Sequence, residues 1–494
     1  MQLKLAKWSS EDPNQRFERL LRLIAQPEWL NLALHAISTN SGFHTPGIDG
    51  VSGKTFLENQ ELHINAIRND LLAGTYKPSP VKRVYIPKVN GTTRPLGIPT
   101  IRDRVVQQAM KMAMEPIWES VFCSCSYGFR PGRSTHHAIR HVVSAASCWS
   151  KQAGSWIIEG DLSNYFGTVH HKKLMKFIKR RIKDKRFLNL IWSFLKAGVM
   201  EKNLFIKTEE GVPQGGIISP LLANIFLHEF DRFMTDLQND LYLKRDEQVK
   251  IGNQSPVCAY VRYADDFVVV VFGTKNQTIA IRNQIKSILE IDLNLTLNMD
   301  KTNITHINDG FMFLGYQIAR KRTASGKMNI VTSIPKIKLD NFCAKLRQVL
   351  SKDFSMDSFD MLMSLTAKIR GWLNYFKFTT FSHYAKSRIS RLSFWKYAYW
   401  LARKHKSKIS LLIKQQKFYS TPNGKKYVTW VRHKQEFING TMVNRFAYLI
   451  SPWDIKNSLF KATTPKGNYF LFVKANAKGI WNDCLSDWRI AFSG

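Results

Sequence analysis

Two adjacent carboxylates stand between two apolar stretches near the middle of the chain. Residues 257–261 and 267–272 are rich in valine and flank the tetrapeptide Tyr263-Ala264-Asp265-Asp266. This pattern predicts two buried strands joined by a tight turn with both acids at its tip. Such a pair is more often ordinary solvated turn chemistry when it occurs alone. Beside a valine-rich core, however, a hard cation such as Mg²⁺ would supply the missing positive charge.

A third carboxylate, Asp161, follows the apolar run Trp156-Ile157-Ile158. The ends of two buried strands would therefore present three acids. Three acids in this arrangement can hold two metal ions for an in-line phosphoryl displacement. The constellation predicts a nucleic-acid polymerase.

The charge of the chain indicates a polyanionic partner. Among 494 residues, 73 Lys and Arg stand against 37 Asp and Glu, which gives a net charge of +36 and a pI near 10.0. Phosphate backbones are the commonest polyanions, and membrane surfaces are the competing choice. The sequence has no apolar run of about 18 residues and no signal-peptide pattern. We therefore expect a soluble, intracellular protein without membrane contact.

The positive charge is concentrated in residues 361–435, which contain seventeen Lys or Arg and neither Asp nor Glu. A solvated helix face normally mixes both signs. Most of the interleaved aromatic residues are expected to form the core face of helices. The cations opposite that face would form a phosphate-binding surface. The six cysteines are scattered and are expected to be reduced packing residues without a zinc site.

Strands and helices must position these groups. Residues 82–86 and 94–98 read as strands around an Asn90-Gly91 hairpin turn, and helices are expected from residues 102, 170 and 219. From residue 335 onward the pattern is helical and basic, and after residue 421 it is rich in turns and irregular. The irregular alternation predicts an α+β fold with helical additions.

Three further segments offer groups that polymerisation needs. Lys88 and Arg94 flank the hairpin turn and could grip a triphosphate, although two exposed turn cations are the simpler interpretation. Residues 211–216 form a glycine-rich loop that would let the backbone approach a ligand. Phe166, five residues after Asp161, could crowd the sugar of a nucleotide or could equally fill the core.

Taken in order, these segments resemble the reverse transcriptases encoded by group II introns. The matching stretches, all read from the sequence, are Thr45-Pro46-Gly47-Ile48-Asp49-Gly50, Val84-Tyr85-Ile86-Pro87-Lys88, Arg94-Pro95-Leu96-Gly97-Ile98-Pro99, Ser126-Tyr127-Gly128-Phe129-Arg130-Pro131-Gly132-Arg133-Ser134, Gly160-Asp161, Pro213-Gln214-Gly215-Gly216, Ser219-Pro220-Leu221-Leu222-Ala223-Asn224, Tyr263-Ala264-Asp265-Asp266, Lys301-Thr302, Phe313-Leu314-Gly315-Tyr316 and Arg370-Gly371-Trp372-Leu373-Asn374-Tyr375-Phe376. The resemblance spans roughly residues 15 to 450, and so many ordered segments make it specific.

The resemblance implies a right-hand polymerase with fingers and palm, formed by an antiparallel sheet with helices, followed by a helical thumb and maturase domain. It implies that the acids bind Mg²⁺, Phe166 favours deoxynucleotides and Lys301 assists the leaving pyrophosphate. The implied site residues are, for catalysis and metal, Asp161, Asp265 and Asp266; for the nucleotide, Lys88, Arg94, Phe166, Gln214, Gly215 and Lys301; for the primer, Phe313, Leu314, Gly315 and Tyr316; and for nucleic acid, Arg130, Arg133, Arg370, Lys377, Arg403, Lys404 and Lys406.

The domain boundaries expected from this resemblance are 1–75 for an N-terminal extension and the start of the fingers, 76–330 for fingers and palm, 335–430 for thumb and maturase, and 431–494 for a short DNA-binding segment. Gly167, His170 and His137 replace acids that the family usually carries, which puts local helix capping in question. Many relatives end in an HNH endonuclease with cysteine pairs, and we expect none here.

The resemblance implies an RNA-directed DNA polymerase that also aids the splicing and mobility of its group II intron. Its expected partners are the intron RNA, an RNA template, a DNA primer and a DNA target, with a homodimer as one oligomeric state to consider. The expected location is the bacterial cytoplasm or nucleoid. Two alternatives remain open: a domesticated reverse transcriptase in repair or phage defence, and an RNA-binding splicing chaperone without polymerase function.

Overall fold

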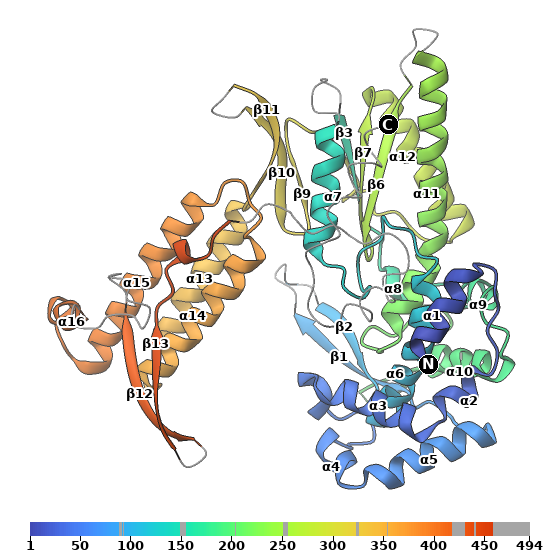
Figure 1. Ribbon diagram of the computed structural model, residues 1–494, viewed down its shortest axis with the longest axis horizontal. Coiled ribbons are helices and arrows are strands. Elements are labelled where there is room, and N and C mark those ends of the chain that lie inside the picture. The colour runs from blue at the N-terminus through green and yellow to red at the C-terminus, as the bar shows by residue number, and fades with distance from the viewer. Residues whose placement is uncertain are drawn as a thin grey trace. The chain divides into compact units, whose positions relative to one another are not determined.

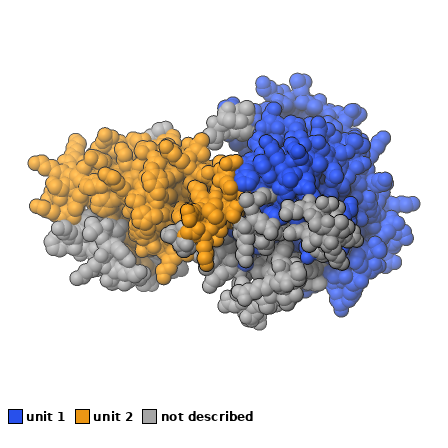
Figure 2. All heavy atoms as spheres, turned by 90° about the horizontal axis from the view of Figure 1, so that it is seen from above, with its two compact units in different colours: residues 1–306, 462–494 blue, residues 307–461 orange. Residues whose placement is uncertain are grey.

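The computed structural model describes residues 1–87, 91, 93–148, 155–202, 204–249, 255–322, 326–352, 354–416, 430–438 and 441–457. These residues divide into two compact units, with the boundary between His306 and Ile307. Figure 2 colours unit 1 blue and unit 2 orange. Each unit has its own cluster of buried apolar side chains.

In unit 1, helices come before the strands and between them along the chain (Figure 1). Its helices are α1 (Gln2–Glu11), α2 (Leu20–Ile24), α3 (Pro27–Ser38), η1 (Ser41–His44), α4 (Gly53–Glu58), α5 (Gln60–Ala73), α6 (Ile101–Glu119), α7 (Thr135–Cys148), α8 (Tyr165–Thr168), α9 (His171–Lys179), α10 (Lys185–Lys196), α11 (Ser219–Val249), α12 (Lys275–Ser287) and η2 (Ile288–Asp292). Its strands are β1 (Val81–Pro87), β2 (Thr93–Ile98), β3 (Ser155–Gly160), β4 (Val199–Glu201), β5 (Leu204–Ile206), β6 (Val257–Tyr263), β7 (Asp266–Phe272) and β8 (Asn303–His306).

The sheet that carries the acids has the strand order β6-β7-β3-β8, and its neighbouring strands are antiparallel. The register pairs Tyr263 with Asp266 and Gly160 with Phe267. Helices α7 and α11 pack on β6, and α12 packs on β3 (Figure 1). Because both faces of the sheet are covered, β7 is a continuous valine run whose members are at most 1% exposed.

A second sheet in unit 1 has the order β2-β1-β4-β5. Strands β1 and β2 form the antiparallel hairpin expected around Asn90-Gly91, and β4 joins β1 in parallel. Strands β4 and β5 lie within a stretch that the sequence pattern did not resolve into strands, because each is only three residues long. Residues 88–90 and 92 lie outside the described residues, so the predicted site residue Lys88 does too.

The helices of unit 1 begin where capping chemistry allows. Thr100 accepts a hydrogen bond from the backbone N–H of Asp103 at the start of α6, and Pro27 occupies the first turn of α3. The helix predicted to begin at Ser219-Pro220 is present and runs to Val249.

Unit 2 combines a three-stranded sheet, a helical layer and a hairpin. Its elements are β9 (Phe311–Phe313), β10 (Tyr316–Arg322), β11 (Met328–Ser333), α13 (Lys336–Lys352), α14 (Ser358–Tyr375), α15 (His383–His405), α16 (Ile409–Gln416), β12 (Val431–Ile438), β13 (Thr441–Tyr448) and η3 (Pro452–Asp454). The buried rings of Tyr397, Trp400 and Trp430 lie at the centre of its core.

Residues 431–448 differ from the prediction of an irregular segment. Strands β12 and β13 pair antiparallel over eight positions. The sequence carried a signal for this hairpin, because Asn439-Gly440 is a favoured two-residue turn between strands. The alternation of polar and apolar residues around it is weak, which is why periodicity alone missed it.

The fold class is α+β, as predicted, with one antiparallel sheet, one mixed sheet and helices in unit 1 and mainly helices in unit 2. Over the part of the chain that the structure describes, no helix is both long enough and apolar enough to span a bilayer.

Candidate active site

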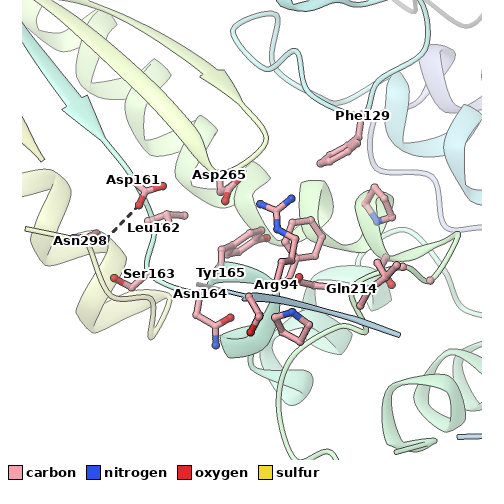
Figure 3. A pocket seen from close by; sticks show the side chains of 18 of the residues that line it. Arg94, Phe129, Asp161, Leu162, Ser163, Asn164, Tyr165, Gln214, Asp265 and Asn298 are labelled. Atoms are coloured by element: carbon pink, nitrogen blue, oxygen red, sulfur yellow. Dashed lines mark hydrogen bonds between the residues drawn. The ribbon is translucent and has the colours of Figure 1, made fainter. Parts of the chain in front are cut away.

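A cavity of about 580 Å³ opens in unit 1 beside the turn between β6 and β7 (Figure 3). Two of the three predicted acids, Asp161 and Asp265, lie in its wall. Its other lining residues are Thr93, Arg94, Pro95, Leu96, Phe129, Leu162, Ser163, Asn164, Tyr165, Phe166, Gln214, Gly215, Gly216, Ser219, Pro220, Asn298 and Lys301. These residues come from segments distributed over some two hundred positions, so the fold creates the cavity.

The turn that carries Asp265 is a two-residue hairpin loop formed by Ala264 and Asp265. Ala264 adopts φ +59°, a left-handed conformation that non-glycine residues seldom take. Gly128 lies directly against the backbone of Ala264, and a side chain at Gly128 would collide with it. The strained turn is thus supported by a neighbouring loop in which only glycine fits at position 128.

A buried ion pair is hydrogen-bonded to the same turn. Arg262 and Asp231 are both 0% exposed, and the guanidinium donates from Nε to Oδ1 at 2.7 Å and from Nη2 to Oδ2 at 2.5 Å. Nη1 of Arg262 also donates to the carbonyl of Ala264 at 2.8 Å and to Oδ1 of Asn224 at 3.1 Å. Nη2 donates further to Oγ of Ser126 at 2.8 Å. One side chain therefore connects helix α11, the 126–128 loop and the acid-bearing turn.

Asp161 follows β3 and is fixed by a second turn, at residues 296–301. The backbone N–H of Asn298 donates to the Asp161 carbonyl at 2.9 Å. Nζ of Lys301 donates to Asp161 Oδ2 at 2.8 Å, and Nδ2 of Asn298 approaches the same oxygen at 3.4 Å (Figure 3 marks the Asn298 bond). Lys301, predicted to act near the pyrophosphate, thus lies beside Asp161, one of the predicted catalytic acids, in this structure.

The pKa values of Asp265 and Asp266 are raised by burial and by neighbouring carboxylates. Burial raises the pKa of Asp265, and the charge of Asp161 raises it further, while Arg94 and Arg262 oppose the change. The pKa of Asp266 is raised to about 6, first by desolvation and then by the charges of Asp265 and Asp161. Carboxylates that repel one another in this way form a site where a cation is stabilising.

The donor set fits Mg²⁺ in a particular way. Among the described residues, no three His, Cys, Asp or Glu side chains form a complete metal site on their own. Mg²⁺ commonly binds through one or two carboxylates together with waters and substrate phosphates, without a full protein cage. The hard oxygens of Asp161 and Asp265 in an open cavity match that mode of binding.

The predicted nucleotide-binding residues that the structure describes converge on the cavity. Arg94 of β2 and Phe166 of α8 both line it, as do Gln214 and Gly215. The carbonyl of Gln214 accepts a hydrogen bond from the backbone N–H of Gly97 at 2.5 Å. Gly215 has φ +110°, and a side chain there would collide with the carbonyl oxygen of Gly97. The glycine loop therefore docks on β2, which is a structural reason for its composition beyond approach to a ligand.

Arg130 and Arg133 do not lie where phosphate contacts require. Their side chains are 1% and 2% exposed. Arg130 binds Glu119 through Nε at 3.0 Å and Nη2 at 2.6 Å and also donates to the carbonyls of Cys123 and Ser126. The predicted nucleic-acid contact by this pair does not fit these positions, because both side chains are buried beside Glu119 of α6. The sequence pattern around the two arginines gave no sign of this buried partner.

The other predicted nucleic-acid and primer residues belong to unit 2. Phe313 and Tyr316 are buried, and Leu314 and Gly315 form a two-residue turn with positive φ between β9 and β10. The carbonyl of Leu314 accepts a hydrogen bond from the Tyr375 hydroxyl at 2.6 Å. This turn is therefore fixed to α14.

The five predicted cations of unit 2 differ in exposure. Arg370, Arg403 and Lys406 are exposed. Lys377 lies over the Phe378 ring, and Lys404 donates to the carbonyl of Phe354 at 2.9 Å. The exposed three are the ones most available to a phosphate.

Histidines stand at two of the positions where acids were expected, and each accepts a hydrogen bond from a backbone N–H. His170 caps α9, because its Nδ1 accepts from the backbone N–H of Lys173 at 3.3 Å. His137 accepts from the N–H of Ser134 at 3.2 Å, and burial lowers the pKa of His137 to about 4. In both histidines an imidazole nitrogen thus accepts the backbone N–H, in the place of the carboxylate that was expected.

Sequence reasoning overlooked Phe129, Asn298, Arg262 and Asp231 as parts of the site. Phe129 and Asn298 line the cavity, while the ion pair acts beneath the turn. The only signal available was that Arg262 would be an isolated cation in an apolar strand, which implies a buried counterion.

Comparison with known proteins identifies the two parts of the chain. The family described as reverse transcriptase (RNA-dependent DNA polymerase) matches residues 86–318. The family described as group II intron, maturase-specific domain matches residues 339–418.

Individual relatives agree with these matches. Protein YkfC of Escherichia coli is 51% identical over 367 residues, covering 71% of this chain and 96% of YkfC. The group II intron-encoded protein LtrA of Lactococcus lactis subsp. cremoris is 34% identical over 371 residues. That match covers 66% of this chain and 60% of LtrA, so the chain spans less than two thirds of LtrA.

Among solved structures, telomerase from Candida albicans bound to telomeric RNA matches with a TM-score of 0.35 and 14% identity, over 75% of this chain and 69% of that one. The assignment rests on the sequence matches instead. The chain belongs to the family of group II intron-encoded reverse transcriptases and maturases, with an RNA-directed DNA polymerase followed by a maturase-specific domain.

Proposed function

We propose that the cavity beside the β6–β7 turn is the polymerisation site, at which dNTPs are added to a DNA primer on an RNA template. The observation that carries the proposal is that Asp161, at the end of β3, and Asp265, in the β6–β7 turn, line one cavity, with Asp266 next to them in the chain and its pKa raised by the charges of both. Reverse transcriptases use divalent metal ions, and Mg²⁺ is the ion these hard oxygens would hold. When bound, it would supply charge stabilisation for the attacking and leaving oxygens.

The other residues of the cavity would orient the nucleotide. Arg94 offers a cation to the triphosphate, and Lys88 is proposed to do the same from the hairpin tip. Gln214 and Gly215 would bound the pocket. Phe166, half-buried at the start of α8, would lie against the sugar and exclude a 2′-hydroxyl. Lys301 would release Asp161 and move to the pyrophosphate as it leaves.

The assignment of the acids is tested by primer extension with Asp161→Asn, measured alongside binding of the template–primer duplex. We expect incorporation to fall by several orders of magnitude with unchanged duplex affinity. Asp236→Asn is the matched control, because Asp236 is an exposed acid on α11 outside the cavity. Wild-type incorporation by Asp161→Asn would reject the site.

The steric role of Phe166 has its own readout. Phe166→Val opens space where the sugar would lie, so incorporation of rNTPs should rise relative to dNTPs by at least about tenfold. Unchanged discrimination between the two sugars would remove Phe166 from the nucleotide pocket.

We further propose that unit 2 binds the group II intron RNA and aids its splicing, with a DNA target engaged during intron mobility. The exposed cations Arg370, Arg403 and Lys406 would contact phosphates, and the turn at Leu314 and Gly315 would position the primer. The proposed organisation is fingers and palm at 76–330, thumb and maturase at 335–430, and a DNA-binding segment at 431–494. The cytoplasm or nucleoid of a bacterium is the proposed location.

Two measurements test the maturase proposal. The logarithm of RNA affinity should fall steeply with the logarithm of salt, and replacing Arg403 by Gln should reduce the slope by about one. Asp265→Ala should abolish polymerisation and leave intron splicing intact. A flat salt dependence, or parallel loss of both activities in Asp265→Ala, would contradict two separable functions.

A further inference from the structure

Phe129 has an unusual position in an otherwise buried loop. Residues 125–128 and Arg130 are all buried, whereas the Phe129 side chain between them is 52% exposed. The exposed ring of Phe129 lines the 580 Å³ cavity. A large aromatic side chain is therefore presented to the site by a segment that buries its neighbours.

Contacts of the residues on both sides of Phe129 fix the ring in this exposed position. The carbonyl of Gly128 accepts from Nδ2 of Asn224 at 2.8 Å. On the other side, Arg130 is tied to Glu119 by the buried ion pair. Phe129 itself adopts φ +58°, which is unfavourable for a bulky L-residue. Strain of this kind in a ligand site is maintained only when the surrounding structure over-determines it, as the two anchors do here.

The ring has a defined neighbour inside the cavity. It meets the Phe166 ring edge to face, with centroids 6.3 Å apart and an interplanar angle of 84°. Phe166 in turn contacts Tyr165 at 5.5 Å. In Figure 3, Phe129 and Asp161 are well apart, with Asp265 and Arg94 drawn between them. The cavity thus has a charged end at the acids and an aromatic end at Phe129.

We propose that Phe129 is a specificity-determining residue whose ring packs against the nascent base pair. The inference rests on the proposed function of the cavity as the nucleotide site. A nucleotide whose triphosphate lies near Arg94 and whose sugar lies near Phe166 must place its base at the remaining, aromatic end. Aromatic rings stack on every base and offer no hydrogen bond to a particular one. Phe129 therefore selects for the fit of the pair and not for its sequence.

The test compares Phe129→Ala, Phe129→Leu and Phe129→Tyr in single-nucleotide incorporation on a defined RNA template. For Phe129→Ala we expect the KM for the correct dNTP to rise at least about fivefold, equivalent to the ~1 kcal/mol at the lower end of base stacking. The ratio of correct to mismatched incorporation should fall as well. Phe129→Leu should behave like Phe129→Ala, and Phe129→Tyr should restore wild-type values.

Controls separate this inference from its alternatives. Phe205→Ala removes an equally exposed phenylalanine from β5, outside the cavity lining, and should leave the KM unchanged. Duplex affinity and melting temperature should stay at wild-type values in all variants, because Phe129 is not a core residue. Full function of Phe129→Leu would overturn stacking, and an unchanged KM in Phe129→Ala would overturn the inference entirely.

Arg94→Ala distinguishes this failure from failure of the proposed function. If Arg94→Ala raises the KM and Phe129→Ala does not, the cavity remains the nucleotide site and only the role of Phe129 is rejected. If neither substitution changes the KM, the assignment of the cavity is rejected together with this inference.

Discussion

The buried pair of Arg262 and Asp231 gives the sharpest prediction about how the acids are held. Asp231→Ala would leave the Arg262 guanidinium buried, with two of its five hydrogen bonds removed. Breaking one side of a fully buried pair costs about 3–5 kcal/mol, because the remaining charge is uncompensated. The same change removes the counterion that orients the guanidinium, and Nη1 of that guanidinium binds the carbonyl of Ala264 in the turn that carries Asp265.

The assay must separate folding from positioning. Hydrogen exchange of peptides covering β6 and β7 gives the local opening free energy, whereas a single melting point would mix two compact units. We expect that free energy to fall by about 3–5 kcal/mol. Primer-extension kcat should fall about 100-fold, the effect expected when reacting groups are misplaced by about 1 Å.

A double variant provides the critical comparison. Asp231→Leu combined with Arg262→Met removes both charges and should recover much of the stability lost in Asp231→Ala. Its kcat should remain low, because nothing then binds the Ala264 carbonyl. Arg180→Ala, at a partly exposed ion pair with Glu229, is the control and should cost at most about 1 kcal/mol. Recovery of wild-type kcat by the double variant would refute the positioning role.

Three further predictions follow from burial and backbone geometry. The pKa of Asp266 is raised to about 6, so its stability contribution is fully present below about pH 4 and is lost as pH rises through 6. Asp266→Asn should therefore raise the local opening free energy of β6 and β7, measured by hydrogen exchange on the metal-free protein, at pH 8 but not at pH 4. Equal changes at both pH values would contradict the raised pKa. Gly215→Ala should cost about 1–3 kcal/mol of stability and reduce incorporation, because φ is +110° and the Gly97 carbonyl is too close for a side chain. Gly371→Ala, in open space on α14, is the control and should stabilise the fold by up to about 1 kcal/mol in thermal unfolding. Arg130→Ala should lose about 3–5 kcal/mol of stability with no change in the salt dependence of RNA binding, and a reduced salt slope would restore it to the nucleic-acid surface.

The sequence was sufficient for the elements and the acids that local patterns determine. The strands around Asp265 follow from continuous apolar runs, and the turn follows from the tetrapeptide between them. Asp161 was found because an apolar strand ends immediately before it. These signals lie within a few residues of the group concerned, so a single sequence carries them.

Contacts between distant segments were beyond the reach of the sequence alone. Arg262 reaches Asp231 over 31 positions and Ser126 over 136, and no local pattern encodes either partner. The same limit affected Arg130, whose buried partner Glu119 lies on the preceding helix. Exposure of Phe129 likewise depends on anchors from α6 and α11, which periodicity cannot reveal.

Asp265 is proposed to belong to the site of Mg²⁺-dependent polymerisation. The most direct measurement is primer extension on poly(rA)/oligo(dT) with dTTP and Mg²⁺, comparing the wild-type protein with Asp265→Ala at equal template–primer occupancy. We expect incorporation by the wild-type protein, and we expect it to disappear when Mg²⁺ is chelated and in Asp265→Ala. Incorporation by Asp265→Ala at the wild-type rate, or none by a folded wild-type protein that binds the duplex, would contradict it.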